Sequence, residues 1–292
     1  MICVTGASGT VGSEVIKQLG EAKAPFRAAY FSEQKAQAAR SKGIDAVTID
    51  YGNPETLRAA FKGCDKLFLL GPNTPDQTQL ELNAVEAAKA GIRHIVKLSM
   101  LGADEEAVSF AKTHRPVEKA IESSGIGWTF LRPNGFMQNV VTYLGDTIKS
   151  EGNFYTAAGD AKISHVDVRD IAAVAVKALT ETGHERKVYT LTGPQALTYD
   201  EIADELSNVL GRKINHIKLS PAEMKGGLLA AGIPEGLADS LLDLERYYRE
   251  QRASFITGDI KTVIGRDPIK FEQYARDHAS SLKPIAEIGA AR

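Results

Sequence analysis

The sequence predicts an α/β fold, a doubly wound parallel sheet wrapped by helices. Two patterns support this prediction. Short apolar runs rich in β-branched residues alternate with longer segments of helical periodicity, as expected for parallel strands joined by crossover helices. Several helical stretches are also followed by glycine, which adopts the positive φ of a helix C-terminus without strain.

The strands are recognised as short apolar runs, which we expect at Ile2–Thr5, Phe26–Tyr30, Ala46–Ile49, Lys66–Leu70, His94–Leu98, Trp128–Leu131, Ile163–Val166 and Val188–Leu191. Helical periodicity lies between them. It predicts helices near Ser13–Glu21, Glu33–Ser41, Pro54–Phe61, Gln77–Ala90, Val117–Ser123, Val168–Leu179 and Tyr199–Leu210. Residues typical of helix ends flank these segments, namely glycine at positions 20, 43, 63, 91 and 125 and an Asn-Pro cap at position 53.

The C-terminal third changes character from about Ser220 onward. It is rich in helical pattern, is interrupted by Gly226, Gly227, Gly232 and Pro234, and has its last strand signal near Ile214–Ile217. We expect a smaller, mostly helical part that covers the sheet edge and the substrate. The predicted dinucleotide-binding domain comprises residues 1–132 and 160–192, and the substrate-binding part comprises residues 133–159 and 193–292.

Composition and charge narrow the range of possible functions. Hydrophobic residues make up 43% and charged residues 25% of the chain, and no apolar run approaches the roughly 20 residues that cross a bilayer. A net charge of −2 lacks the basic excess typical of nucleic-acid binding. We therefore expect a small-molecule partner, with no membrane and no nucleic acid, in a monomer or homodimer.

The cysteines and the N-terminus predict the compartment. Cys3 falls in the first predicted strand and Cys64 is the other cysteine, so a disulfide framework is not expected. The chain starts directly with MICVTG, which lacks the basic and apolar segments of a signal peptide. A cytoplasmic protein is the expectation.

A glycine-rich turn, VTGASGTVG at residues 4–12, joins the first strand to the first helix. Gly6 permits the tight turn, Gly9 lets the backbone approach a pyrophosphate, and Gly12 lets the helix pack close to the strand. Free amides and the positive dipole end would meet the phosphates. This turn predicts a Rossmann-type site whose cofactor-binding residues include Gly6, Ser8, Gly9, Thr10, Val11 and Gly12.

Several motifs occur along nearly the whole chain. They are TGASGTVG, Asp50-Tyr51 with Asn53-Pro54, Leu70-Gly71-Pro72, AAKAG at 87–91, GIGWTFLRPN at 125–134, VRDIA at 168–172 and Gly183-His184-Glu185 through Val188-Tyr189. Together with the glycine spacing, they resemble the NmrA-like family of atypical short-chain dehydrogenase/reductases. Within that family, the chain resembles the branch containing triphenylmethane reductase and the NAD(P)H:quinone oxidoreductases. The resemblance implies an NAD(P)H-dependent oxidoreductase.

Cofactor preference depends on the end of the second strand, where an acidic residue holds a ribose diol and a basic residue holds a 2′-phosphate. The family often has arginine where this chain has Phe31, but Ser32 and Lys35 can both contact a phosphate. We expect NADP(H) to be preferred and NAD(H) to be possible, and Glu33 could reverse the preference. The resemblance places Asp50 and Tyr51 at the adenine, although Asp50 could equally cap its loop. Further expected cofactor contacts are Gly71, Pro72, Asn73, Ser99, Met100, Pro133 and Asn134.

The Tyr-x-x-x-Lys pair of the wider superfamily is absent. His114 stands where relatives place a catalytic lysine or histidine, and its pKa near neutrality suits proton donation, although a structural role is the alternative. Without the tyrosine, an electron-poor acceptor such as a quinone or conjugated dye is favoured over a plain ketone.

Residues after the sixth strand, at the carboxyl edge of the sheet, would shape the acceptor slot. The substrate-lining candidates are Phe136, Met137, Tyr143 and Phe154, of which Phe136 and Met137 could equally be core residues. No metal is expected, because no second His or Cys lies at ligand spacing from His184. A non-catalytic NAD(P)-binding redox sensor remains the alternative function, and an isomerase or epimerase is a third.

Overall fold

The computed structural model describes residues 1–284 and confirms the Rossmann-type doubly wound fold. All neighbouring strands of the main sheet run parallel, in the order β3-β2-β1-β4-β5-β6-β8. These strands are β1 (Ile2–Val4), β2 (Phe26–Tyr30), β3 (Ala46–Thr48), β4 (Lys66–Leu69), β5 (His94–Leu98), β6 (Gly127–Pro133) and β8 (Lys187–Leu191). Strand order reverses between β1 and β4, and such a switch point is where open α/β sheets bind ligands.

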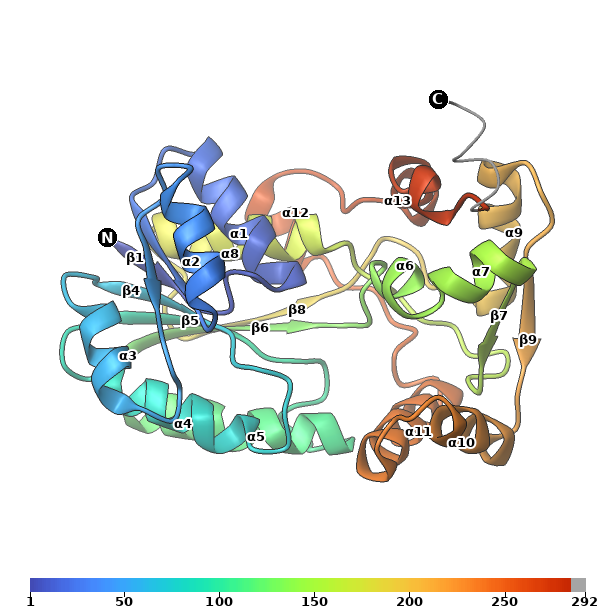
Figure 1. Cartoon of the computed structure of the whole chain (residues 1–292), viewed down its shortest axis with the longest axis horizontal. Helices are drawn as coiled ribbons and strands as arrows, with labels where there is room; N and C mark the ends of the chain where they lie inside the picture. Colours follow the sequence, from blue (N-terminus) through green and yellow to red (C-terminus); the bar gives the residue numbers. More distant parts are fainter. Residues whose placement is uncertain (285–292) are drawn as a thin grey trace.

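Helices cover both faces of the sheet (Figure 1). One layer contains α1 (Thr10–Glu21), α8 (Val168–Thr180) and α12 (Asp259–Ile264), in which α8 packs against both α1 and α12. The opposite layer contains α3 (Pro54–Phe61), α4 (Gln77–Ala88) and α5 (Ser109–Ser123). The helix α2 (Glu33–Arg40) packs on β2 and β3. Buried residues of each layer meet the sheet in a separate hydrophobic cluster, which fixes the carboxyl edge of the strands in space.

The remaining elements gather beyond the carboxyl ends of the strands (Figure 1). They are α6 (Asn139–Tyr143), α7 (Gly145–Glu151), β7 (Asn153–Thr156), α9 (Tyr199–Leu210), β9 (Asn215–Lys218), α10 (Pro221–Ala230), α11 (Glu235–Arg249), α13 (Phe271–Asp277) and a 3₁₀ turn at Ala279–Leu282. All of these elements except β9 and α10 contribute to one hydrophobic cluster, which includes Phe154, Tyr199 and Tyr274. The helix-rich C-terminal character is thus confirmed, while the exact domain boundaries stay a prediction.

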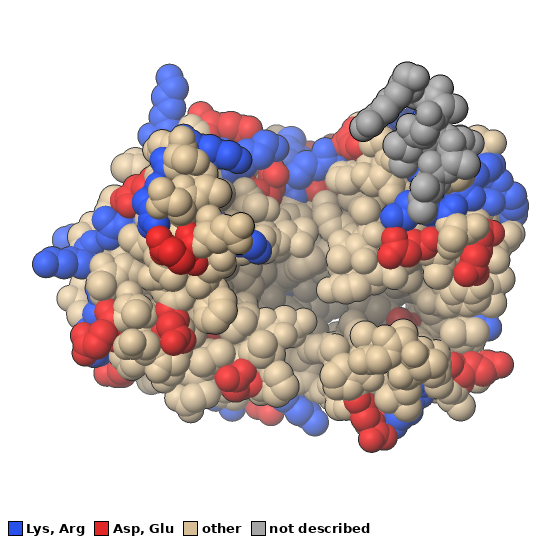
Figure 2. All heavy atoms as spheres, viewed as in Figure 1, with Lys and Arg blue, Asp and Glu red and all other residues tan. Residues whose placement is uncertain are grey.

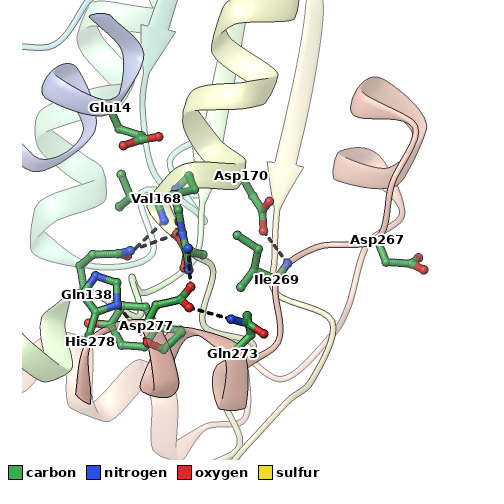
Figure 3. Close-up of polar contacts among 12 residues, drawn as sticks. Glu14, Gln138, Val168, Asp170, Asp267, Ile269, Gln273, Asp277 and His278 are labelled. Atoms are coloured by element: carbon green, nitrogen blue, oxygen red, sulfur yellow. Dashed lines mark hydrogen bonds and ion pairs between the residues drawn. The ribbon is translucent and has the colours of Figure 1, made fainter. Parts of the chain in front are cut away.

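Polar contacts tie this C-terminal part to the start of α8 (Figure 3). The side chain of Gln138 donates to Asp167 over 3.0 Å and accepts from the Val168 amide over 3.1 Å. Asp170 accepts the Ile269 amide over 2.7 Å, and Arg169 pairs with Asp277 over 2.6 Å. The loop after β6 is therefore attached to the same helix end that receives the C-terminal segment.

Two sequence predictions about elements were wrong. Ile163–Val166 is not a strand of the sheet, because it forms only isolated bridges, from Val166 to Phe136 and from Ile163 to Leu197. Its apolar residues are buried where the chain passes between the main sheet and the C-terminal part. The helix expected from Val117 begins at Ser109, with Pro116 inside it. The proline does not end the helix, because Ala111, Val117 and Ile121 bury one continuous face.

A two-stranded parallel sheet, β7 with β9, supports the C-terminal part. The signal near Ile214–Ile217 is confirmed as β9, whereas β7 was not predicted. None of the helices within residues 1–284 has the length and apolarity needed to cross a membrane.

Candidate dinucleotide and acceptor site

The glycine-rich turn lies at the switch point, between β1 and α1. Gly6 has φ +63°, and a Cβ at this position would lie 2.9 Å from the carbonyl oxygen of Leu70. A Cβ at position 12 would lie 2.1 Å from the carbonyl oxygen of Gly6. Real Cβ contacts do not reach such distances, so both positions require glycine. The first turn of α1 therefore lies directly against the loop, as the motif predicts.

The N-terminus of α1 presents open amide donors. Gly9 is the N-cap residue and provides no side-chain cap, and the first turn carries no acidic residue. Among the described contacts, the amide of Gly9 bonds Gly6 and that of Ser13 bonds Gly9, while those of Thr10 and Val11 have no protein acceptor. Ser8, Gly9 and Thr10 are exposed. This is a cradle for an anionic group, and its shape fits the diphosphate of a dinucleotide.

The residues expected to determine the preference for NADP(H) or NAD(H) follow the end of β2. Phe31 is 77% exposed, and Lys35 is exposed one turn into α2. Ser32 caps α2 by accepting the Lys35 amide over 3.4 Å. The carboxylate of Glu33 accepts hydrogen bonds from Thr48 and Arg40. The Thr48 bond, helped by Arg40, lowers the pKa of Glu33, so this carboxylate is ionised and already paired.

Asp50 and Tyr51 follow β3 and differ in their surroundings. Asp50 is exposed and accepts the Gly52 amide over 2.8 Å, so it caps its own loop. Tyr51 is buried, and its hydroxyl donates to the Leu70 carbonyl over 2.7 Å. Burial raises its pKa. Tyr51 thus ties the β3 loop to the end of β4, and adenine contacts by these two residues stay a prediction.

The loop after β4 is held by a buried carboxylate that the sequence analysis did not identify. Glu81 on α4 accepts the Gly71 amide over 2.8 Å. A Cβ at position 71 would lie 2.5 Å from the Glu81 Cγ, so Gly71 allows this approach. Pro72 is half-buried and Asn73 is exposed beside it. Glu81 also pairs with Lys97 of β5 over 2.6 Å, and both side chains are fully buried.

His114 lies next to this pair, on α5. Its Nδ1 is 3.3 Å from the Nζ of Lys97. Burial, followed by the Lys97 charge, holds the pKa of His114 well below its usual range. This environment therefore favours the neutral ring, whereas the expectation of proton donation depended on the near-neutral pKa of an ordinary histidine. A catalytic role for His114 stays a prediction.

A second buried network lies at the ends of β5 and β6. Glu118 of α5 is fully buried, accepts the Ser99 hydroxyl over 2.7 Å, and receives two hydrogen bonds from Arg132. Arg115 bonds the same carboxylate over 3.0 Å. The hydroxyl proton of Ser99 is thus already used in a hydrogen bond to Glu118. Met100 beside it is half-buried.

The loop after β6 is equally well anchored. The side-chain Nδ2 of Asn134 donates to the Ser164 hydroxyl over 2.9 Å and to the Ala253 carbonyl over 2.8 Å. Both Pro133 and Asn134 are buried. These contacts fix the backbone that leaves the carboxyl edge, and direct cofactor contacts by the two residues stay a prediction.

The acceptor-lining candidates lie in different environments. Tyr143 is 73% exposed and Phe136 is half-buried. Met137 is buried in the C-terminal core, and Phe154 has no accessible surface and packs on Tyr199 and His216. In this structure Phe154 cannot touch a ligand directly, because the core encloses it.

A hollow separates the sheet from the C-terminal elements, and side chains other than Lys, Arg, Asp and Glu dominate its visible walls (Figure 2). A cavity of about 330 Å³ lies at the ends of β6 and β8, where Arg132, Thr190, Tyr247 and Arg252 are among its lining residues. A larger hollow of about 590 Å³ lies between α1, α8 and α12, and no expected site residue lines it. Within residues 1–284, no group of three or more His, Cys, Asp or Glu side chains is placed to hold a metal.

Comparison with known proteins identifies the family. The profile of the NmrA-like family matches residues 1–277. The chain belongs to the NmrA-like family. This NmrA-like protein is 38% identical over 284 residues to the NAD(P)H azoreductase of Xenophilus azovorans, covering 97% of this chain and 99% of the relative.

Two solved structures resemble this NmrA-like protein closely. One is the NADPH-dependent quinone oxidoreductase of Escherichia coli in complex with NADPH, with a TM-score of 0.87 and 31% identity over 95% of this chain and 99% of the other. The other is the triphenylmethane reductase of a Citrobacter species in complex with NADP(H), with a TM-score of 0.85 and 31% identity over 96% of this chain and 100% of the other. The resemblance noted in the sequence is confirmed.

Proposed function

We propose that this chain is an NADP(H)-dependent reductase that transfers hydride to a small electron-poor acceptor, such as a quinone or a conjugated dye. The observation that carries the proposal is the amide cradle of residues 6–12, which fits a dinucleotide diphosphate and requires glycine at positions 6 and 12. Relatives at 38% and 31% identity that span nearly the whole chain are named as reductases of this kind.

The end of β2 supports NADPH over NADH. An acidic side chain that selects NADH must be available to the ribose diol, and the carboxylate of Glu33 is engaged by Thr48 and Arg40. Lys35 is exposed in the first turn of α2 and can meet a 2′-phosphate. NADH remains a weaker cofactor in this proposal.

The acceptor class follows from the groups that the site offers. A plain ketone needs an acid for its developing alkoxide, and the chain has no Tyr-x-x-x-Lys pair and holds His114 neutral. A bound reduced nicotinamide supplies the hydride. The chain contributes orientation and a weakly charged hollow at the carboxyl edge (Figure 2). A cytoplasmic location and a monomeric or homodimeric state belong to the same proposal.

The test begins with calorimetric titration of the purified protein with NADPH and with NADH. Oxidation of each cofactor is then followed with a panel of quinones, azo dyes and triphenylmethane dyes. We expect tighter binding of NADPH and turnover with at least one acceptor class. Binding without any turnover would instead support the redox-sensor alternative, and no binding of either cofactor would refute the proposal.

A further inference from the structure

Lys97 of β5 and Glu81 of α4 form an ion pair in which both side chains are 0% exposed. Burying two charges is costly unless every hydrogen-bonding group is satisfied. The Lys97 ammonium meets this condition with three acceptors. They are Glu81 Oε2 at 2.6 Å, the Leu98 carbonyl at 3.0 Å and His114 Nδ1 at 3.3 Å.

This contact determines the tautomer of His114. An ammonium has three donors and no acceptor, so the imidazole nitrogen that faces it must offer a lone pair. Nδ1 of His114 is therefore unprotonated, and the ring proton is on Nε2. The lowered pKa of His114, caused by burial and by the Lys97 charge, agrees with a neutral ring.

The Nε2–H group lies on the opposite side of the ring from Lys97. Within residues 1–284 it has no protein acceptor, and it is not among the buried polar atoms without a partner. His114 as a whole is half-buried. The other oxygen of Glu81 holds the Gly71 amide at 2.8 Å, so the same carboxylate also orders the loop after β4.

We propose that Lys97, supported by Glu81, is a positioning residue that holds His114 as a neutral Nε2–H donor to the acceptor atom that gains negative charge. This inference rests on the proposed reductase function. In this proposal His114 donates a hydrogen bond and does not act as a charged acid. The buried pair of Lys97 and Glu81 keeps the His114 ring in the tautomer that can donate.

The chemical step is balanced without an enzymic proton. A bound reduced nicotinamide would supply a hydride, with its two electrons, as its C–H bond breaks. The hydride would form an O–H bond at one quinone oxygen and leave the other oxygen as a phenolate. The Nε2–H of His114 hydrogen-bonds to that oxygen and keeps its own proton. Water would then protonate the phenolate to give the hydroquinone, and the oxidised cofactor would be the other product.

The tautomer can be tested without cofactor or acceptor. The protein is labelled with ¹⁵N at its six histidines, and the His114 signals are assigned by their loss in His114→Gln. We expect an unprotonated Nδ1 and a protonated Nε2 throughout roughly pH 6 to 8. An imidazolium, or the opposite tautomer, at pH 7 would overturn the proposal even if the protein turns over no acceptor.

Kinetics separate a neutral donor from an acid. Glutamine offers an N–H near the position of Nε2 but cannot act as a cationic acid, whereas leucine offers neither. With NADPH and a quinone that the protein reduces, His114→Leu should lower kcat roughly ten- to hundred-fold and leave the KM for NADPH unchanged. His114→Gln should recover most of that loss. Equal loss in the two variants would contradict the donor role.

The role of the buried pair is tested with the double variant Lys97→Met and Glu81→Gln. It leaves no unpaired buried charge, and the glutamine can still accept the Gly71 amide. Burial and then the Lys97 charge lower the pKa of His114, and Glu81 pairs with Lys97 on its other side. We expect the NMR pH titration of His114 to shift upward, toward the ordinary range of histidine, and the preference for the Nε2–H tautomer to weaken. An unchanged tautomer and pH titration would show that the pair does not act on His114.

Discussion

Gly12 lies against Gly6 so closely that a Cβ at position 12 would be 2.1 Å from the Gly6 carbonyl oxygen and 2.7 Å from its carbonyl carbon. Both obstructing atoms are backbone, so no side-chain rotation can relieve the clash. The loop can accept a larger residue only by moving away from α1. The amide cradle can therefore keep its position only if residue 12 has no side chain.

The variant Gly12→Ala should therefore lose cofactor binding. The displaced loop no longer aims its amides at one point, and we expect NADPH affinity to fall at least ten-fold, measured by calorimetry. Gly20→Ala is the matched control on the same helix, because nothing lies within 4 Å of its Cβ position. That substitution should raise the free energy of unfolding by about 0.5–1 kcal/mol and leave binding unchanged. Similar binding losses in both variants would argue against the cradle.

Lys35→Ala tests the expected contact with the 2′-phosphate. Losing one exposed charge contact costs about 1 kcal/mol, so the Kd for NADPH should rise about five-fold while that for NADH stays constant. Lys42→Ala is the control, because Lys42 is equally exposed but follows the opposite end of α2. A parallel loss of affinity for NADH would place Lys35 away from the phosphate.

Glu118 is expected to be essential for stability. Glu118→Ala removes the buried carboxylate that pairs with Arg132 and leaves only the exposed carboxylate of Asp104, and breaking a buried ion pair costs about 3–5 kcal/mol. Glu122→Ala removes the outer, partly exposed partner of Arg115 and should cost less than about 1 kcal/mol. Urea unfolding followed by circular dichroism measures both values. A small effect at Glu118 would mean that water replaces the carboxylate.

The sheet and the glycine-rich turn could be predicted because their signals are local. A buried parallel strand is a continuous apolar run, and the turn is defined by three glycines within seven residues. Ile163–Val166 misled the analysis for the same reason, since an apolar run is equally compatible with a buried connection. Its partners, Phe136 and Leu197, come from distant parts of the chain.

The buried ion pairs could not be predicted, because each joins residues whose proximity depends on the tertiary fold. Glu81 and Glu118 lie in helical patterns, where an acidic residue normally faces solvent. One signal was available. Lys97 is a charged residue within a buried strand, and such a lysine needs a buried carboxylate, although the sequence does not say which one.

His165 provides a test of how stability depends on pH. Its ring is buried 5.6 Å from that of Tyr199, and burial lowers its pKa to about 4. Below about pH 6.5 the unfolded chain protonates this histidine and the folded chain does not, so stability should fall with pH by about 1.4 kcal/mol per unit until about pH 4. In His165→Phe this contribution disappears. Urea unfolding of both proteins between about pH 4.5 and 7 should give profiles whose slopes differ by one proton. Parallel profiles would mean that His165 is protonated to the same extent in the folded and unfolded chains.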